Sequence, residues 1–173
     1  MRRVRYSVAM SLDGYIAGRD GEAGWIPHDP SFDFNALFSQ FDTVLIGRNT
    51  FESMVRAGQT VMPGMNTYVF STTLRQENHP GVTLVSGDPT PLVRKLRAER
   101  GKDIWLFGGG QLFRSFLEAG LVDTVEIALV PVLLGGGIPV LAPLGQSTNL
   151  KLVAARPFEN TGIVALEYQC ERS

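Results

Sequence analysis

The ten-residue stretch IWLFGGGQLF, at residues 104–113, constrains the fold more than any other part of the chain. Its first four residues are apolar and favour β structure, which is typical of a strand buried on both faces. After three glycines the apolar residues return at helical spacing, and Gly120 provides a C-terminal stop. The stretch therefore predicts a strand, a tight turn and the start of a helix.

The three glycines at residues 108–110 have two explanations. They let the backbone N–H groups of the helix start approach a phosphate, as in a dinucleotide site. They also suit a turn that merely needs glycine backbone angles. Phe113 occupies the third position of the G-x-G-x-x-G fingerprint, so the stretch alone leaves both explanations open.

Strands and helices alternate before Gly120. The expected strands are short and apolar and lie at residues 4–10, 43–46, 66–70, 82–85 and 104–107. The expected helices carry apolar residues at helical spacing and lie at residues 34–41, 51–55, 91–100 and 112–117. Such alternation predicts crossover connections and a largely parallel sheet that is covered on both faces.

After Gly120 the pattern changes to strands alone. We expect them at residues 123–134, 150–156 and 163–169, and the last two are joined by a hairpin turn at residues 160–162. The sequence shows no linker and no repeat. It predicts a single α/β domain over residues 1–173, with a mainly parallel sheet and an antiparallel C-terminal hairpin.

The charge balance and the cysteine content exclude several function classes. Lys and Arg number 16 against 17 Asp and Glu, which leaves no basic footprint for nucleic acid. The single cysteine, Cys170, cannot form an internal disulfide, and with only His28 and His79 present a Cys/His zinc site is not expected. The apolar runs are too short for a signal peptide or a membrane span. We therefore expect a cytoplasmic protein with no membrane partner and no bound metal.

Three predicted strand ends carry small, basic or hydroxyl residues: Gly47 with Arg48, Ser71 with Thr72, and residues 108–110. In an open α/β sheet, ligands bind at the carboxyl ends of strands, near a switch in strand order. The guanidinium of Arg48 and the two hydroxyls match the oxygens of a 2′-phosphate, which favours NADP(H) over NAD(H). The alternative is that Arg48 is a solvated cap residue and that the hydroxyl residues merely end a strand.

A glycine- and aspartate-rich loop runs from Ser11 to Trp25. Loops of this length are often functional, and the apolar Ile16 and Trp25 favour that interpretation over a surface excursion. The sequence leaves open whether residues 18–24 close over a site.

Three motifs together resemble the dihydrofolate reductase superfamily: D-G-x-I-A at residues 13–17, G-R-x-T-x-E at residues 47–52 and F-G-G-G at residues 107–110. Two others, S-L-D-G at residues 11–14 and P-x-L-L-G-G-G at residues 131–137, resemble the reductase domain at the C-terminus of bifunctional riboflavin deaminase-reductases. The resemblance implies a dihydrofolate reductase-like three-layer sandwich. It also implies hydride transfer from NADPH to a pyrimidine-like substrate, similar to the 5-amino-6-(5-phosphoribosylamino)uracil of riboflavin biosynthesis.

The resemblance further implies which residues contact the cofactor, with Trp25 beside the nicotinamide. The implied contacts are Ala9, Ile16, Ala17, Trp25, Gly47, Arg48, Thr50, Ser71, Thr72, Gly108, Gly109, Gly110, Gln111 and Leu112.

The sequence departs from both kinds of reductase at positions that bear on the substrate. Met65 follows Pro63 and Gly64 where dihydrofolate reductases carry an arginine for the folate tail. An apolar side chain cannot bind that carboxylate, so dihydrofolate reduction is the second choice. Phe107 stands where the riboflavin reductases often carry a glutamate. One cysteine cannot supply the zinc signature of a deaminase half, so we expect a stand-alone reductase.

Three carboxylates are candidate catalytic acids: Asp13, Asp29 and Asp33. A carboxyl group in a half-apolar pocket can have a raised pKa and can orient or protonate a pyrimidine-like ring. Each also has an ordinary interpretation, Asp13 as a turn residue, Asp29 as a helix cap and Asp33 as a first-turn acid.

Two apolar stretches, residues 125–134 and 138–141, exceed what the edge of a small sheet needs. They favour a homodimer. The alternative to an enzyme is a non-catalytic nucleotide-binding dimer, which has kept the fold but has lost catalysis.

Overall fold

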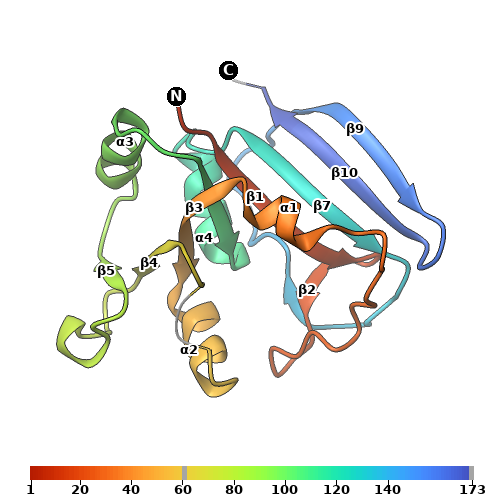
Figure 1. Cartoon of the computed structure of the whole chain (residues 1–173), viewed down its shortest axis with the longest axis horizontal. Helices are drawn as coiled ribbons and strands as arrows, with labels where there is room; N and C mark the ends of the chain where they lie inside the picture. The colour runs from red at the N-terminus through yellow and green to blue at the C-terminus, as the bar shows by residue number, and fades with distance from the viewer. Residues whose placement is uncertain (60–61, 172–173) are drawn as a thin grey trace.

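The structure is a computed structural model that describes residues 1–59 and 62–171, and an eight-stranded sheet forms its centre (Figure 1). From one edge to the other the strands are β5 (Thr83–Val85), β4 (Asn66–Phe70), β3 (Phe41–Gly47), β6 (Asp103–Gly108), β1 (Val4–Ser11), β7 (Thr124–Val130), β10 (Ile163–Cys170) and β9 (Leu150–Phe158). The strands from β5 to β7 are parallel, whereas β10 and β9 are antiparallel to their neighbours. This order confirms the predicted mainly parallel sheet with an antiparallel C-terminal hairpin.

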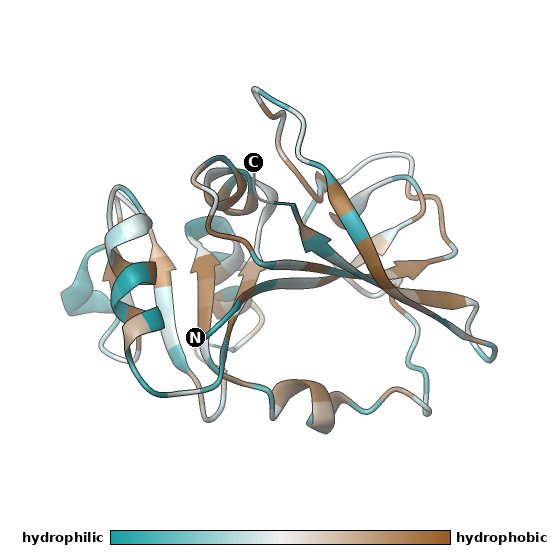
Figure 2. Ribbon diagram, turned by 90° about the horizontal axis from the view of Figure 1, so that it is seen from above, coloured by the Kyte–Doolittle hydropathy of each residue, from teal (hydrophilic) through white to brown (hydrophobic). Residues whose placement is uncertain are grey.

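Helices cover both faces of the parallel part of the sheet. They are α1 (Phe34–Phe38), α2 (Arg48–Arg56), α3 (Thr90–Ala98) and α4 (Gly110–Glu118), with a short 3-10 helix at Gln76–Asn78. Because strand side chains alternate, Leu45 of β3 packs with α3 and α4, whereas Val44 and Ile46 pack with α2. Figure 2 shows the apolar central strands between the more hydrophilic outer surfaces of the helices. Among the described helices, none combines the length and the hydrophobicity that a membrane crossing requires.

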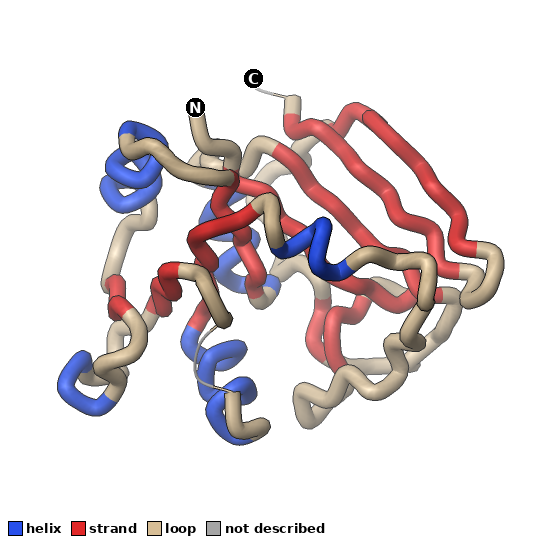
Figure 3. The backbone as a smooth tube through the Cα atoms, in the orientation of Figure 1, coloured by secondary structure: helices blue, strands red, loops and turns tan. Residues whose placement is uncertain are grey.

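The C-terminal strands extend beyond the helices, as Figure 3 shows for β10 and β9. In β9 every residue except Phe158 is exposed. The two apolar stretches that favoured a dimer are buried in part, although Leu133 and Ile138 are 70 and 37% exposed. β7 is hydrogen-bonded between β1 and β10, and Val140 and Leu141 pack on the core.

Apart from the short 3-10 helix and shifts of one to three residues at the ends of other elements, the structure differs from the sequence prediction at three places. β7 ends at Val130 and not at residue 134, because Pro131 has no N–H group with which to continue a strand ladder. α1 ends at Phe38, and Phe41, which was expected in the helix, begins β3 and is buried. The strands β2 (Tyr15–Ala17) and β8 (Ile138–Pro139) pair in a small second sheet that no local pattern indicated.

The buried side chain of Arg2 joins the start of β1 to three neighbouring segments. Its guanidinium donates to the carbonyl oxygens of Lys102 (2.7 Å) and Leu96 (3.3 Å), and to the hydroxyl of Thr43 (2.7 Å). It also forms an ion pair with Asp42. Because Arg2 is only 6% exposed, its removal leaves buried acceptors unpaired.

We expect Arg2→Met to lower the free energy of unfolding by about 3 kcal/mol, because Asp42 loses its ion pair and the carbonyl oxygens of Leu96 and Lys102 lose a donor. The control is Arg3→Met. Arg3 pairs with Asp103 and is 52% exposed, so its loss should cost less than about 1 kcal/mol. Urea denaturation of both variants measures the difference, and equal losses would contradict the buried role of Arg2.

Candidate functional site

Two helices begin at adjacent strand ends and open onto the same crevice. α2 follows β3 at Gly47, α4 follows β6 at Gly109, and β3 and β6 are neighbours in the sheet. The two helices lie on opposite faces, so the crevice is a point at which the strand order switches. Neither glycine offers a capping side chain, which leaves the first N–H groups of both helices for a ligand.

The glycines between β6 and α4 serve both the turn and the crevice. Gly108 has a φ of +107°, which other residues rarely adopt, and its peptide bond to Gly109 is cis. A Cβ atom at Gly110 would lie 2.6 Å from the carbonyl oxygen of Pro139. A Cβ atom at Gly109 would lie 3.6 Å from the hydroxyl oxygen of Thr50, in ordinary contact. Of these two positions, only residue 110 must therefore be glycine because another backbone segment lies too close for a Cβ atom.

The segment that leaves β8 holds the start of α4 in place. The N–H of Ala142 donates to the carbonyl oxygen of Gly110 (3.3 Å), and the hydroxyl of Tyr6 donates to the carbonyl oxygen of Val140 (3.0 Å). The ring of Tyr6 stacks on Phe113 with centroids 3.6 Å apart. Burial raises the pKa of Tyr6, so its hydroxyl remains a hydrogen-bond donor.

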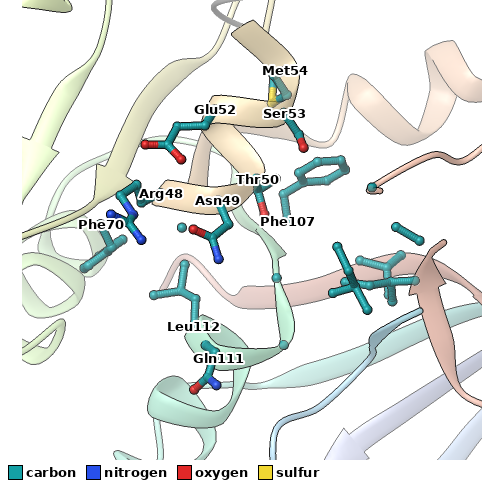
Figure 4. Close-up of a pocket in the computed structure, with 18 of the residues that line it drawn as sticks. Arg48, Asn49, Thr50, Glu52, Ser53, Met54, Phe70, Phe107, Gln111 and Leu112 are labelled. Carbon is teal, nitrogen blue, oxygen red and sulfur yellow. The ribbon is translucent and has the colours of Figure 1, made fainter. Parts of the chain in front are cut away.

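These elements line an open cavity of about 1480 Å³ (Figure 4). Of the residues expected to contact the cofactor, those that line it are Ala9, Ile16, Ala17, Gly47, Arg48, Thr50, Ser71, Thr72, Gly109, Gly110, Gln111 and Leu112. Gly108 is buried in the turn. The cavity is large enough for a dinucleotide and a second small molecule.

Trp25 lies apart from the other expected cofactor residues. It does not line the cavity and packs with Val130, Phe158 and Ile163 beneath the C-terminal strands. Its indole N–H is buried and has no hydrogen-bond partner among the described residues. Its neighbour Ile26 does line the cavity. The position of Trp25 beside the nicotinamide stays a prediction.

Arg48 reaches from the start of α2 to the end of β4. Its Nη1 donates to the hydroxyl oxygen of Thr73 (3.1 Å). The hydroxyl oxygen of Ser71 accepts from the N–H groups of Thr73 (3.1 Å) and Leu74 (3.0 Å). Arg48, Thr72 and Thr73 are exposed at the edge of the cavity. The guanidinium N–H groups therefore lie beside two hydroxyls, an arrangement that suits a phosphate. Thr73 was not among the expected residues, although the Ser-Thr-Thr run contains it.

Sequence reasoning also missed Asn49, Ser53 and Phe107, which line the cavity. In Figure 4 the side chain of Asn49 points toward Gln111, and the ring of Phe107 lies beside α2, next to Ser53. Asn49 and Ser53 are four residues apart, so they lie on the same face of α2, the face toward the cavity. That spacing is the signal that could have found them.

Asp13 joins the end of β1 to the glycine-rich segment at residues 135–137. Its carboxylate accepts from the hydroxyl of Ser11 (2.7 Å) and from the N–H groups of Leu134 (3.1 Å) and Gly135 (2.8 Å). The bond from Ser11, reinforced by the backbone bonds, lowers the pKa of Asp13.

Asp29 fixes the segment before α1 to the turn between β9 and β10. Its buried carboxylate accepts from the hydroxyl (2.6 Å) and the N–H (2.9 Å) of Ser31 and from the hydroxyl of Thr161 (2.7 Å). These bonds, the Ser31 hydroxyl first, lower the pKa of Asp29. Asp33, not Asp29, is the helix cap, because it accepts from the N–H of Ala36 (2.8 Å). None of the three candidate acids lines the cavity, and their catalytic role stays a prediction.

Comparisons with known proteins agree with this geometry. The family model for the RibD C-terminal domain matches residues 2–164. The uncharacterized protein YyaP of Bacillus subtilis (strain 168) is 34% identical over 182 residues, which cover 96% of this chain and 94% of YyaP. A protein from Shewanella sp. PV-4 that carries a provisional assignment to riboflavin biosynthesis has a solved structure with a TM-score of 0.82 and 29% identity, covering 99% of this chain and 100% of that one.

The comparisons also confirm the dihydrofolate reductase-like fold. The dihydrofolate reductase of Enterococcus faecalis, solved with NADP(H), superimposes with a TM-score of 0.73 at 18% identity, over 98% of this chain and 97% of that one. The resemblance drawn from the motifs is therefore correct both for the fold and for the family of reductase domains.

The bonds to Asp13 and Asp29 predict a loss of stability in acid. Both groups have a folded-state pKa below the ordinary value of 3.8. Their stabilisation is therefore complete above that value and disappears as the pH falls through the lower folded-state pKa. We expect Asp29→Asn to unfold at a lower temperature than the unmodified protein at neutral pH, and the difference to shrink in acid.

Thermal unfolding followed from about pH 7 to pH 2 measures this convergence. Asp33→Asn is the matched control, because asparagine caps a helix as well as aspartate does. A gap between Asp29→Asn and the unmodified protein that stays constant at every pH would refute the assignment.

Proposed function

Because the chain belongs to the RibD C-terminal domain family, we propose that it is an NADPH-dependent reductase that transfers hydride to a pyrimidine-like substrate. The observation that carries the proposal is the pair of uncapped helix N-termini at neighbouring strands, with Arg48 and Thr73 beside them. The first substrate to test is 5-amino-6-(5-phosphoribosylamino)uracil, which the resemblance to riboflavin reductases implies.

The two ends of the proposed cofactor site make different demands on the ligand. The N-terminus of α4 suits a pyrophosphate, because its free N–H groups and the helix dipole both favour an anion. Arg48, Ser71 and Thr72 suit the 2′-phosphate, which NADPH carries and NADH lacks. The NADP(H) bound to the similarly folded Enterococcus faecalis enzyme supports this choice.

Bound NADPH supplies the hydride. The protein's own residues bind the cofactor and the substrate, orient them and exclude water. Val8, Ile26, Met54 and Phe107 give the cavity apolar walls. Such walls hold a substrate ring in one orientation against the cofactor, which converts an encounter into an intramolecular step.

For Asp13, Asp29 and Asp33 we propose a positioning role in this reaction. Their hydrogen bonds fix the turn after β1, the segment before α1 and the start of α1. These segments carry Ile16 and Ile26, which line the cavity. The lowered pKa of Asp13 and of Asp29 also makes these two carboxylates poor proton donors at neutral pH.

Two other outcomes identify the alternatives. Oxidation of NADPH with dihydrofolate would mark a dihydrofolate reductase. We expect little turnover because Met65 packs in the core beside α2 and offers no cation for the folate tail. Binding of NADPH without turnover of any pyrimidine or pterin would mark a non-catalytic nucleotide-binding dimer.

Titrations with NADPH and NADH test the cofactor site. We expect Arg48→Ala to weaken NADPH binding about 10- to 100-fold and to leave NADH binding unchanged, because a charge-assisted contact contributes about 1.5–3 kcal/mol. Arg94→Ala, on the exposed face of α3, is the matched control and should change neither affinity. Equal weakening of both nucleotides by Arg48→Ala would contradict the 2′-phosphate assignment.

We further propose that the protein is a cytoplasmic homodimer. Its single cysteine fits a reducing compartment. The edge strand β9 exposes Leu150, Leu152 and Val153 by 41, 53 and 55%. That is a contiguous apolar surface on a strand that no helix covers, and two copies of one face can form an isologous contact.

Sedimentation at micromolar concentration tests the dimer. We expect the unmodified protein to sediment as a dimer and Leu152→Lys to sediment as a monomer. In a two-fold contact the introduced lysine would be buried against the same lysine of the partner or against an apolar surface, and either arrangement is unfavourable. Arg156→Lys, on the same strand, keeps the charge and is the control. A monomer before any substitution would overturn the proposal.

A further inference from the structure

The side chain of Tyr6 lies in the core beneath the turn between β6 and α4. It is 0% exposed and does not line the cavity. Its ring stacks on Phe113 of α4, with centroids 3.6 Å apart and planes 9° apart. A Cβ atom at Gly108 would lie 3.4 Å from the same ring, so the turn packs on it as well. Tyr6 therefore supports the turn and the first part of α4 without reaching the cavity itself.

The hydroxyl of Tyr6 holds a carbonyl group that lies against the start of α4. It donates to the carbonyl oxygen of Val140 at 3.0 Å. That oxygen lies 3.1 Å from the position of a Cβ atom at Gly110, the first residue of α4. In the part of the chain that the structure describes, the Tyr6 hydroxyl is the one donor to this oxygen. The hydrogen bond thus fixes the direction in which the Val140 carbonyl points.

The N–H groups at the start of α4 are alternative donors for this carbonyl. The N–H of Phe113 is the first to bond within the helix, to the carbonyl oxygen of Gly109 (3.0 Å). The N–H groups of residues 110–112 precede it, and Gly109 has no capping side chain. Gln111 and Leu112 also line the cavity (Figure 4). A neighbouring carbonyl that accepted from these N–H groups would cap the helix in place of an anion.

Loss of the Tyr6 hydroxyl would leave the Val140 carbonyl without its donor in a partly buried place. An acceptor that is buried without a partner costs free energy, so the carbonyl has reason to turn to the free donors beside it. Those donors are the N–H groups of residues 110–112, which a pyrophosphate needs. The hydroxyl and the ligand are therefore linked through one carbonyl group.

We infer that Tyr6 is a positioning residue for the cofactor. Its hydroxyl keeps the Val140 carbonyl away from the N-terminus of α4 and so leaves that terminus free to bind a pyrophosphate. Tyr6 acts through Val140 and contacts no ligand itself. The inference rests on the proposed function, in which the pyrophosphate of NADPH binds at this terminus.

Calorimetric titrations of Tyr6→Phe test the link to the pyrophosphate. The variant loses the hydroxyl and keeps the ring that stacks on Phe113. We expect it to bind NADP+ about tenfold more weakly, and 2′-AMP, which has no pyrophosphate, with a change of less than about twofold. Tyr168→Phe is the matched control, because it removes a hydroxyl from a half-buried tyrosine of β10 and should change neither affinity.

Amide hydrogen exchange, followed by NMR without nucleotide, separates positioning from a structural role. In Tyr6→Phe we expect at least one N–H group of residues 110–112 to exchange about tenfold more slowly than in the unmodified protein, because the Val140 carbonyl then accepts from it. A variant that had merely loosened the turn would exchange faster at all of these groups.

The outcomes separate this inference from the proposed function. Failure of NADP+ to bind the unmodified protein would overturn the proposed cofactor and the role of Tyr6 together. If NADP+ binds, an unchanged affinity in Tyr6→Phe, an equal weakening of NADP+ and 2′-AMP, or unchanged or faster exchange at residues 110–112 would overturn the role of Tyr6 alone.

Discussion

The close approach of two backbone segments, at the start of α4 and just after β8, is the constraint on which the site depends. Gly110 has no Cβ atom, and the carbonyl oxygen of Pro139 occupies the space that one would need. The same segment is tied to the turn after β1, where the N–H of Val140 donates to the carbonyl oxygen of Gly14 (2.9 Å), and to the middle of β1 through Tyr6. A shift of this segment would therefore move the floor of the cavity and the helix N-terminus together.

The charged groups of the chain divide between support and recognition. Asp13 and Asp29 each accept three hydrogen bonds and link loops that are distant in sequence. Arg2 does the same at the opposite end of the sheet. Arg48 differs, because it is exposed and, among the described residues, its guanidinium donates to one hydroxyl, that of Thr73. A group whose hydrogen-bonding capacity is used within the fold stabilises it, whereas a group with spare donors at a cavity edge can bind a ligand.

The sequence predicted what depends on local chemistry. The strand, glycine and helix junctions at Gly47 and Gly109 follow from apolar spacing, and Arg48 and Ser71 follow from their places at strand ends. It could not predict contacts between distant segments. The pairing of β2 with β8, the contact of Arg48 with Thr73 and the donors that surround Asp29 join residues many positions apart, and no period or spacing records them.

The outer strand β9 determines how the sheet ends. Val153 is an extra residue between the pairs that join Leu152 to Tyr168 and Ala154 to Glu167, so the strand is bulged at its middle. Pro157, nearer its end, has no N–H group to offer. A bulge and a proline interrupt the row of backbone donors and acceptors that another chain would need in order to add a ninth strand. The molecule can thus present apolar side chains on this strand and still resist the edge-to-edge growth that leads to fibrils.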